Sequence, residues 1–361
     1  MPRFVPGLKL SRLFYEEEVE PILRKEFPEL VYSAAVIGWG SEVLGFDTSI
    51  SRDHHWGPRV LLFLSEKDSP QLSKKIRSTL SQQLPYEFMG YSTNFSNPEQ
   101  NGVRHPVKIS SGPVDHMVNI YTIRSLFKFR IGHDPFRKIS VKDWLSFPQQ
   151  RLLELTTGEV YHDGLGQLEK IRSKFKYYPR DIWLYLLAAQ WIRIAHEEAF
   201  VGRTGHVGDE LGSSLLAARL IRELMKLSFL MEQQYAPYSK WLGSAFQNLK
   251  IAKELTPVFR RVLAAEKWRT RQRWLSAAYV IVVKHHNALG ITEPLPEEVS
   301  NYYGRPYLVI HAERFPQPIM AAIKDPNVRK IRTPIGSVDQ YTDSTGVIED
   351  LGLLKKLKGV Y

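Results

Sequence analysis

The chain has 361 residues, of which 43% are apolar and 24% charged, a balance typical of a globular protein with more than one domain. It contains no cysteine and no run of about 18 apolar residues, which excludes disulfides, thiolate metal sites, cysteine nucleophiles and a membrane-spanning helix. Lysine and arginine outnumber aspartate and glutamate by 49 to 38, and the net charge of +11 favours anionic partners as much as it favours a simple role in solubility.

The first third of the chain predicts alternating helices and strands. Residues 1–7 are basic and lack the apolar core of a signal peptide, so we expect a cytoplasmic protein. Helical spacing of apolar residues predicts two helices, and short apolar runs rich in β-branched residues predict strands. The expected helices are 10–27 and 69–83, and the expected strands are 31–37, 60–64, about 86–91, and 107–109.

From residue 141 onward the spacing becomes helical over long stretches. Three helices are predicted, over 181–200, 211–234 and 258–289, and Asp209 is placed to cap the second of them. We therefore expect an α/β core over residues 1–140 and a mainly α-helical bundle over 141–295. Residues 296–361 are expected to form an irregular or short mixed tail that packs on the rest.

The segment between the first two predicted strands contains the residues that we expect to bind a phosphate group and a metal ion. A strand leads into Gly40-Ser41, a short helix is expected next, and a polar turn brings Asp53 to the second strand. Glycine allows a close backbone approach to a phosphate, and the Ser41 hydroxyl with the amides of a helix start can bind it. A carboxylate beside it could hold the Mg²⁺ that accompanies a triphosphate. These parts together predict a site for phosphoryl or nucleotidyl transfer.

This arrangement resembles the nucleotidyltransferase superfamily, whose core has Gly-Ser, a helical turn and Ser-Asp-x-Asp on the next strand. The whole chain looks like an uncharacterised, largely bacterial family described only as a domain of unknown function and grouped with the nucleotidyltransferases. The resemblance implies a nucleotidyltransferase-like core with a mixed sheet and a helical domain after it. The segments that carry it are 40–45, 53–59, 177–181, 208–213 and 235–241.

The chain departs from the superfamily pattern in its acids. Two carboxylates at alternate positions of a strand face the same side and can share one metal ion. Here the alternate partner of Asp53 is His55, which suits Mn²⁺ better than Mg²⁺. The third acid is not evident, because the predicted strand 107–109 offers Lys108. Asp47, Glu159 or Asp163 could replace it, and we take Asp47 as the candidate metal ligand beside Asp53 and His55.

The helical part offers candidates for binding phosphate or an acceptor. Arg203 lies in a glycine-rich polar loop, and Lys240 lies beside tyrosines and a tryptophan that could stack on a base. Their alternative roles are a solvated loop and a packed turn between helices. The arginines at 269, 271 and 273 alternate within a predicted helix, so we expect them to spread around it and face solvent.

Two functions follow from these patterns. The first is a metal-dependent nucleotidyltransferase that uses a nucleoside triphosphate with Mg²⁺ or Mn²⁺ and an unknown acceptor. In it Gly40, Ser41, Arg203 and Lys240 bind the nucleotide, and Asp53 and His55 act with Ser41 in catalysis. The alternative is a degenerate protein that binds or senses a nucleotide without turnover. A third, weaker reading is a nucleic-acid-binding protein driven by the net charge.

Overall fold

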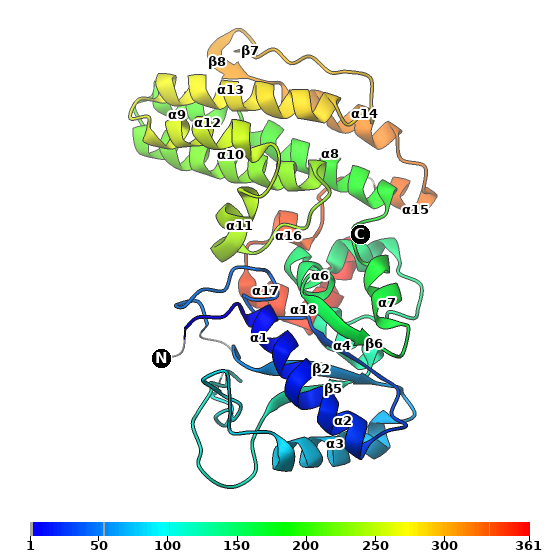
Figure 1. Ribbon diagram of the computed structural model, residues 1–361. Coiled ribbons are helices and arrows are strands. Elements are labelled where there is room, and N and C mark those ends of the chain that lie inside the picture. The colour runs from blue at the N-terminus through cyan, green and yellow to red at the C-terminus, as the bar shows by residue number, and fades with distance from the viewer. Residues whose placement is uncertain (1–2, 53–54, 101, 332) are drawn as a thin grey trace. The chain divides into compact units, whose positions relative to one another are not determined.

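The computed structural model describes residues 3–52, 55–100, 102–331 and 333–361 (Figure 1). The chain divides into two compact units: the first contains residues 1–139 and 151–176, and the second contains residues 140–150 and 177–361. Residues 151–176, which the sequence prediction assigned to the helical domain, thus belong to the first unit. Among the described residues, no helix is both long enough and apolar enough to span a membrane.

The first unit is built on a four-stranded mixed sheet in the order β5-β2-β1-β6. Strand β2 runs parallel to β5 and antiparallel to β1, and β1 runs antiparallel to β6. The strands are β1 (Tyr32–Val36), β2 (Arg59–Leu64), β5 (Met117–Tyr121) and β6 (Glu159–Asp163), with a separate hairpin of β3 (Glu87–Phe88) and β4 (Tyr91–Ser92). The helices are α1 (Gly7–Phe14), α2 (Glu20–Glu26), α3 (Ser69–Gln83), α4 (Ile123–Ile131), α6 (Gln149–Thr156, shared between the units) and α7 (Leu168–Lys174). The predicted α/β core with a mixed sheet is confirmed.

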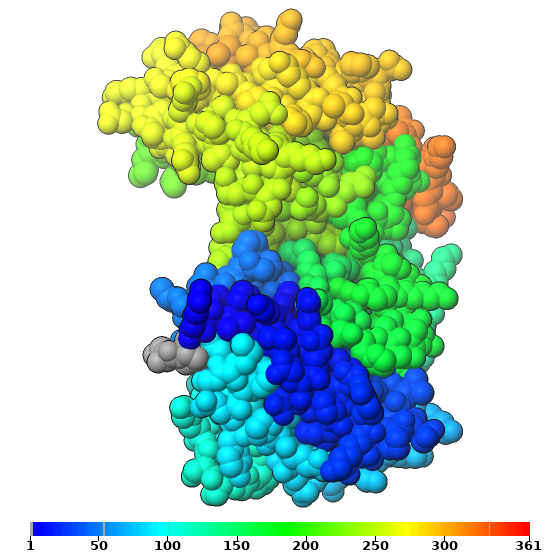
Figure 2. Space-filling model, viewed as in Figure 1, coloured from blue at the N-terminus to red at the C-terminus, as the bar shows by residue number. Residues whose placement is uncertain are grey.

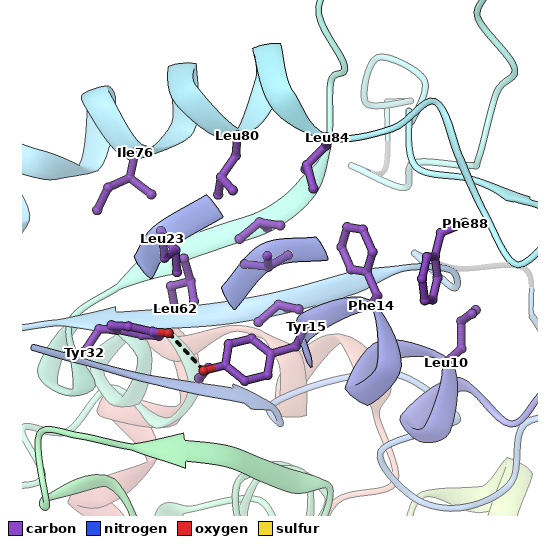
Figure 3. Packing of buried hydrophobic residues seen from close by; sticks show 14 of the residues in the cluster. Leu10, Phe14, Tyr15, Leu23, Tyr32, Leu62, Ile76, Leu80, Leu84 and Phe88 are labelled. Carbon is purple, nitrogen blue, oxygen red and sulfur yellow. Dashed lines mark hydrogen bonds between the residues drawn. The ribbon is translucent and has the colours of Figure 1, made fainter. Parts of the chain in front are cut away.

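One face of this sheet is buried under α1, α2 and α3. Alternate residues of β2, including Leu62, point into a cluster with Phe14 and Leu23 from the first helices and Leu80 from α3 (Figure 3). These side chains are almost completely removed from water, which is worth about 2 kcal/mol for each large aliphatic residue. The sequence pattern that predicts α3 is the same pattern that supplies Ile76 and Leu80 to this face.

The predicted helix 10–27 is confirmed with one irregularity. Between α1 and α2 the chain forms a π-helical segment, Tyr15–Val19, and Pro21 follows in the first turn of α2. Proline lacks an amide hydrogen and clashes with the carbonyl four residues earlier, so a regular α-helix is disfavoured there. The wider π turn relieves that conflict. It also directs Tyr15 inward, where its hydroxyl lies 2.9 Å from the hydroxyl of Tyr32.

The strand predicted at residues 107–109 is wrong. Lys108 lies in an irregular segment, and the only pairing nearby is a single bridge between Phe95 and Pro106. The strand that completes the sheet is β5, in which Asn119 is opposite Leu61 of β2.

The second unit is mainly helical. Its long helices are α8 (Arg180–Glu197), α10 (Glu210–Met231), α12 (Ala252–Ala264) and α13 (Trp268–Asn287). The shorter elements are α5 (Val141–Ser146), α9 (Phe200–His206), α11 (Ser239–Phe246), a hairpin of β7 (Ser300–Tyr302) and β8 (Arg305–Val309), α14 (Pro316–Ala321), α15 (Pro326–Arg329), α16 (Val338–Tyr341), α17 (Thr345–Glu349), α18 (Leu351–Leu357) and two 3₁₀ turns, Ala312–Arg314 and Lys358–Val360. The predicted helical domain is thus present, and the tail packs within the same unit.

The single helix predicted over 258–289 is wrong, because α12 and α13 are separated by a break at residues 265–267. Ala265 has an extended backbone. The guanidinium of Arg271 turns inward and donates hydrogen bonds to the carbonyls of Ala265 (2.8 Å) and Glu266 (3.2 Å). Carbonyls at a helix end need such partners, and Arg271 supplies them from the next helix.

A buried carboxylate holds the end of α8 in the second unit. Both oxygens of Glu198 accept backbone hydrogen bonds, from Ile310 (2.8 Å) and from Ala312 (2.9 Å). Burial raises the pKa of Glu198 from its ordinary 4.5 to about 7, although the backbone donors oppose that shift. The folded protein therefore binds a proton at this residue more tightly than the unfolded chain does.

This pKa predicts that the protein loses stability as pH rises. The contribution of Glu198 is complete below pH 4.5 and disappears as pH rises through about 7. Urea unfolding of the wild type and Glu198→Gln at several pH values measures it. We expect the difference in unfolding free energy between the two proteins to change by roughly 2–3 kcal/mol between pH 5 and 8. A difference that is constant over this range would contradict the assignment.

Candidate functional site

The segment between β1 and β2 forms an irregular loop in the first unit. Residues 41–45 form a turn in place of the predicted short helix, and the amide of Phe46 closes it on the carbonyl of Ser41 at 2.9 Å. Gly40 and Gly45 have positive φ angles of 113° and 73°, which only glycine adopts without strain. Among the described residues, the amides of Ser41, Val43 and Leu44 have no hydrogen-bond acceptor. A turn with free amides is a potential anion-binding concavity.

The Ser41 side chain joins the two ends of this loop. Its hydroxyl donates a hydrogen bond to the carbonyl of Ser51, at 3.0 Å. This hydrogen bond holds the turn after β1 against the segment around Ser51, which precedes Asp53 in the sequence. Asp53 itself lies outside the described residues, so its position as a predicted metal ligand is not tested.

A buried ion pair that the sequence did not reveal lies under this loop. Arg59, the first residue of β2, contacts Oε1 of Glu42 through Nε and Nη2, both at 2.7 Å, and its Nη2 also donates to the carbonyl of Trp39. The two side chains are only 1% and 2% exposed. Burial raises the pKa of Glu42, and the charge of Arg59 opposes that effect.

The ion pair explains why residue 40 must be glycine. A Cβ atom there would lie 2.5 Å from Oε2 of Glu42 and 2.7 Å from Nη2 of Arg59. Within the described residues, Oε2 of Glu42 and Nη1 of Arg59 have no hydrogen-bond partner. Gly40 was predicted to allow a phosphate to approach the backbone, and in this fold it also makes room for the ion pair.

Asp47, a predicted metal ligand, accepts two hydrogen bonds from other parts of the first unit. Its Oδ2 accepts hydrogen bonds from the amide of Gly7 (2.6 Å) and from the indole of Trp56 (3.0 Å). The ring of Trp56 is buried and stacks on Phe4 at 5.9 Å. Asp47 thus attaches the start of α1 to the loop.

Glu159 and Asp163, the other candidates for the third acid, also have partners within the protein. Glu159 forms an ion pair with Arg12 of α1. Asp163 accepts a hydrogen bond from Ser33 at 2.6 Å and caps α7 through the amide of Glu169. Although burial opposes it, these donors lower the pKa of Asp163.

The described residues contain no group of three metal-binding side chains placed to hold an ion together. Among residues 3–52, 55–100, 102–331 and 333–361, no group of three His, Asp or Glu side chains could hold a metal ion. His55 has a left-handed backbone with φ of 55°, and its amide contacts the carbonyl of Arg104 at 3.3 Å. Metal binding by His55 stays a prediction.

An aromatic and cationic cluster adjoins the Gly-Ser turn. The partly exposed ring of Trp39 lies under the guanidinium groups of Arg59 (5.6 Å) and Arg130 (5.7 Å). The edges of Tyr121 and Phe129 contact the same ring. Cations over an aromatic ring stabilise its position. Sequence reasoning missed this cluster, because its members come from the loop after β1, from β2, from β5 and from α4.

The remaining predicted binding residues belong to the second unit. The guanidinium of Arg203 lies 5.6 Å from the ring of Phe200, and the ammonium of Lys240 lies 4.9 Å from the ring of Trp241. Asp209 caps α10 by accepting the amide hydrogen of Gly212 at 2.7 Å, as its sequence position predicts. Binding by Arg203 or Lys240 stays a prediction.

A family model matches part of the chain, and a solved structure is similar to it. Residues 144–242 match a family model described as Domain of unknown function (DUF4037), which confirms the sequence-based recognition of an uncharacterised family of that kind. A solved structure, a nucleotidyltransferase-like protein from Exiguobacterium sibiricum 255-15, is similar at 10% identity and a TM-score of 0.29, over 90% of this chain and 91% of the other. No curated protein matches the chain.

Removing the Asp47 carboxylate tests its structural role. We expect Asp47→Ala to lower the free energy of unfolding by about 1–3 kcal/mol, because two buried donors lose their acceptor. Urea unfolding monitored by tryptophan fluorescence measures this. A variant as stable as the wild type would show that Asp47 is free for another role, such as binding a metal ion.

The ion pair predicts non-additive substitutions. Glu42→Met alone leaves the charge of Arg59 buried and unpaired, and we expect it to cost about 3–5 kcal/mol of unfolding free energy. The double variant Glu42→Met/Arg59→Met removes both charges and should be more stable than the single variant. Chemical unfolding of the three proteins decides the matter, and equal losses for the single and double variants would contradict a buried, coupled pair.

Proposed function

We propose that the first unit binds a nucleoside triphosphate at the loop between β1 and β2 and uses it for nucleotidyl transfer to an acceptor of unknown identity. The observation that carries the proposal is the 3.0 Å hydrogen bond from Ser41 to the carbonyl of Ser51. It supports a loop in which the Gly-Ser turn and the segment bearing Asp53 meet. The triphosphate is assigned to the free amides that follow Gly40.

The electrostatics of the loop support an anionic ligand. The described carboxylates nearest the turn are neutralised or engaged: Glu42 by Arg59 and Asp47 by two hydrogen-bond donors. Backbone amides with a nearby guanidinium favour a phosphate group. Trp39, held at the turn by two arginines, adds an aromatic surface next to the proposed phosphate site.

Mg²⁺ or Mn²⁺ enters this proposal as part of the substrate, bound to the triphosphate. Asp53 and His55 are the proposed protein contacts to that ion, and Arg203 and Lys240 the proposed contacts of the second unit to nucleotide or acceptor. The chemistry that such an ion supplies is neutralisation of the phosphate charge. No step of the reaction is assigned to it.

One observation favours a second function, nucleotide binding without turnover. Asp47, Glu159 and Asp163 were the candidates for a further metal-binding acid, and each has a structural partner. A site without a further metal-binding acid would bind a metal–nucleotide complex without transferring the nucleotidyl group. The two functions share the binding step and differ in product formation.

A thermal-shift screen with ATP, GTP, CTP and UTP, each with Mg²⁺ or Mn²⁺, tests the shared step. A ligand present at about 100 times its Kd adds about 2.7 kcal/mol to the stability of the native state, so at least one nucleotide should raise the Tm by several degrees. Asp53→Asn should reduce that shift, and Lys355→Gln on α18 should leave it unchanged.

Incubation of the stabilising nucleotide, labelled at the α-phosphate, with cell extract then separates the two functions. Label in a new product and release of pyrophosphate indicate transfer. Binding without either indicates a nucleotide sensor. If no nucleotide stabilises the wild type, or if Asp53→Asn responds as the wild type does, the proposal fails.

A further inference from the structure

The positive charge of the protein is concentrated on two consecutive helices of the second unit. Residues 252–287, which contain α12 and α13, have eight lysine or arginine residues and two glutamates, a net of +6 out of +11 for the whole chain. Five exposed cations lie around the turn that joins the helices. We call them the basic hairpin cluster: Arg260, Arg261, Lys267, Arg269 and Arg273.

The basic hairpin cluster has no carboxylate partners. Among the described residues, none of its five members forms an ion pair or a hydrogen bond with another side chain, and Glu266 is the only acid between positions 255 and 284. Exposed arginines elsewhere do have such partners: Arg24 contacts Glu20, and Arg219 contacts Glu197. Like charges three or four positions apart on a helix are destabilising, so Arg269 and Arg273 repel each other on α13.

Two of the arginines lie over tryptophan rings. The guanidinium of Arg261 lies 4.4 Å from the ring centre of Trp274, and that of Arg269 lies 4.4 Å from the ring centre of Trp268. Stacking uses the face of the guanidinium group and leaves its N–H edge free. A guanidinium whose orientation is fixed loses less entropy when its edge binds a phosphate.

The three alternating arginines of α13 spread around the helix as predicted, but the expectation that all three face solvent is wrong for Arg271. Arg271 is buried and donates to Glu210 (3.1 Å) and Ser213 (2.8 Å), both on α10. Arg269 and Arg273 are four positions apart, so they lie on the same, exposed side of α13. The yellow residues in Figure 2 show that this hairpin contributes to the outer surface of its unit.

We propose that the basic hairpin cluster binds the phosphodiester backbone of a nucleic acid. Five exposed cations around one turn, two of them guanidinium groups that lie over tryptophan rings, match a polymer that carries one phosphate per nucleotide. An anionic membrane is the less suitable partner, because membrane-surface helices also need an apolar face to insert. Within the described part of the hairpin, Leu263 is the only large apolar side chain that is mainly exposed, at 62%.

The site does not depend on the function proposed for the first unit. Nucleotide binding there rests on the loop 40–59, and the residues of the basic hairpin cluster belong to another unit. A negative result for nucleotide binding by the first unit would therefore not contradict nucleic-acid binding by the basic hairpin cluster.

Fluorescence anisotropy with a labelled 20-nucleotide RNA, at 50 to 250 mM KCl, tests the proposal on the full chain. If about five phosphates are contacted, the slope of log K against log salt should be about −3.5 for a single strand. The double variant Arg260→Gln/Arg273→Gln removes two cations that have no internal partner. We expect it to weaken binding about 10-fold and to reduce the slope by about 1.4.

A matched control removes the same charge elsewhere in the second unit. Lys355 and Lys356 are exposed on α18, and Lys355→Gln/Lys356→Gln should change the affinity less than 2-fold. Arg261→Lys/Arg269→Lys keeps the charge and removes the planar group, so binding should weaken about 3- to 10-fold with an unchanged slope.

Three outcomes would overturn the proposal. They are no RNA binding at 50 mM KCl, equal losses for the hairpin and α18 variants, and binding to vesicles containing phosphatidylserine but not to RNA. Circular dichroism of each variant confirms that a loss of binding is not a loss of fold. The Arg→Lys pair, which retains every charge, provides the second test should the Arg→Gln pair be unstable.

Discussion

The buried ion pair between Glu42 and Arg59 is the constraint on which the candidate site depends. It ties the turn after β1 to the first residue of β2, and it requires glycine at position 40 because any side chain there would collide with both charged groups. Two charges removed from water are expensive unless they remain paired. The loop therefore has little freedom to adopt another arrangement, and the Ser41 hydroxyl is held where it meets Ser51. Rigidity of this kind favours a preformed binding turn.

The elements that local pattern determines were predictable. The helix 69–83 agrees with its prediction at both ends, because its apolar spacing alone indicates which face is buried. The strands around residues 34 and 62 were found for a similar reason: both are buried along their whole length and appear as continuous apolar runs. The long helices α8 and α10 follow the same rule.

The errors arise where a distant contact overrides the local pattern. Residues 107–109 alternate like a strand but have no neighbouring strand to pair with, whereas β5 pairs with β2 along its length. The break between α12 and α13 depends on Arg271, which turns inward to the end of the preceding helix. In the candidate site, the carboxylate of Asp47 accepts a hydrogen bond from Gly7, which lies forty positions earlier in the chain. No spacing rule relates such residues.

The charged side chains of the two units have different kinds of partners. In the first unit the carboxylates near the loop are bound to cations or amides, which leaves the backbone of the turn as its main free binding group. In the second unit, none of the five cations of the basic hairpin cluster forms an ion pair within the described part of the chain, and Arg261 and Arg269 lie over tryptophan rings. The two proposals assign a nucleotide to the first arrangement and a phosphodiester polymer to the second, and both ligands are anions that a positively charged protein attracts.

The central claim is that the loop between β1 and β2 is the triphosphate site, and hydrogen–deuterium exchange with mass spectrometry tests it most directly. The exchange of the full chain is compared with and without a non-hydrolysable ATP analogue and Mn²⁺. The account predicts slower exchange in peptides covering residues 40–46, whose amides include those of Ser41, Val43 and Leu44. Unchanged exchange in these peptides, with protection confined to other parts of the chain, would contradict it.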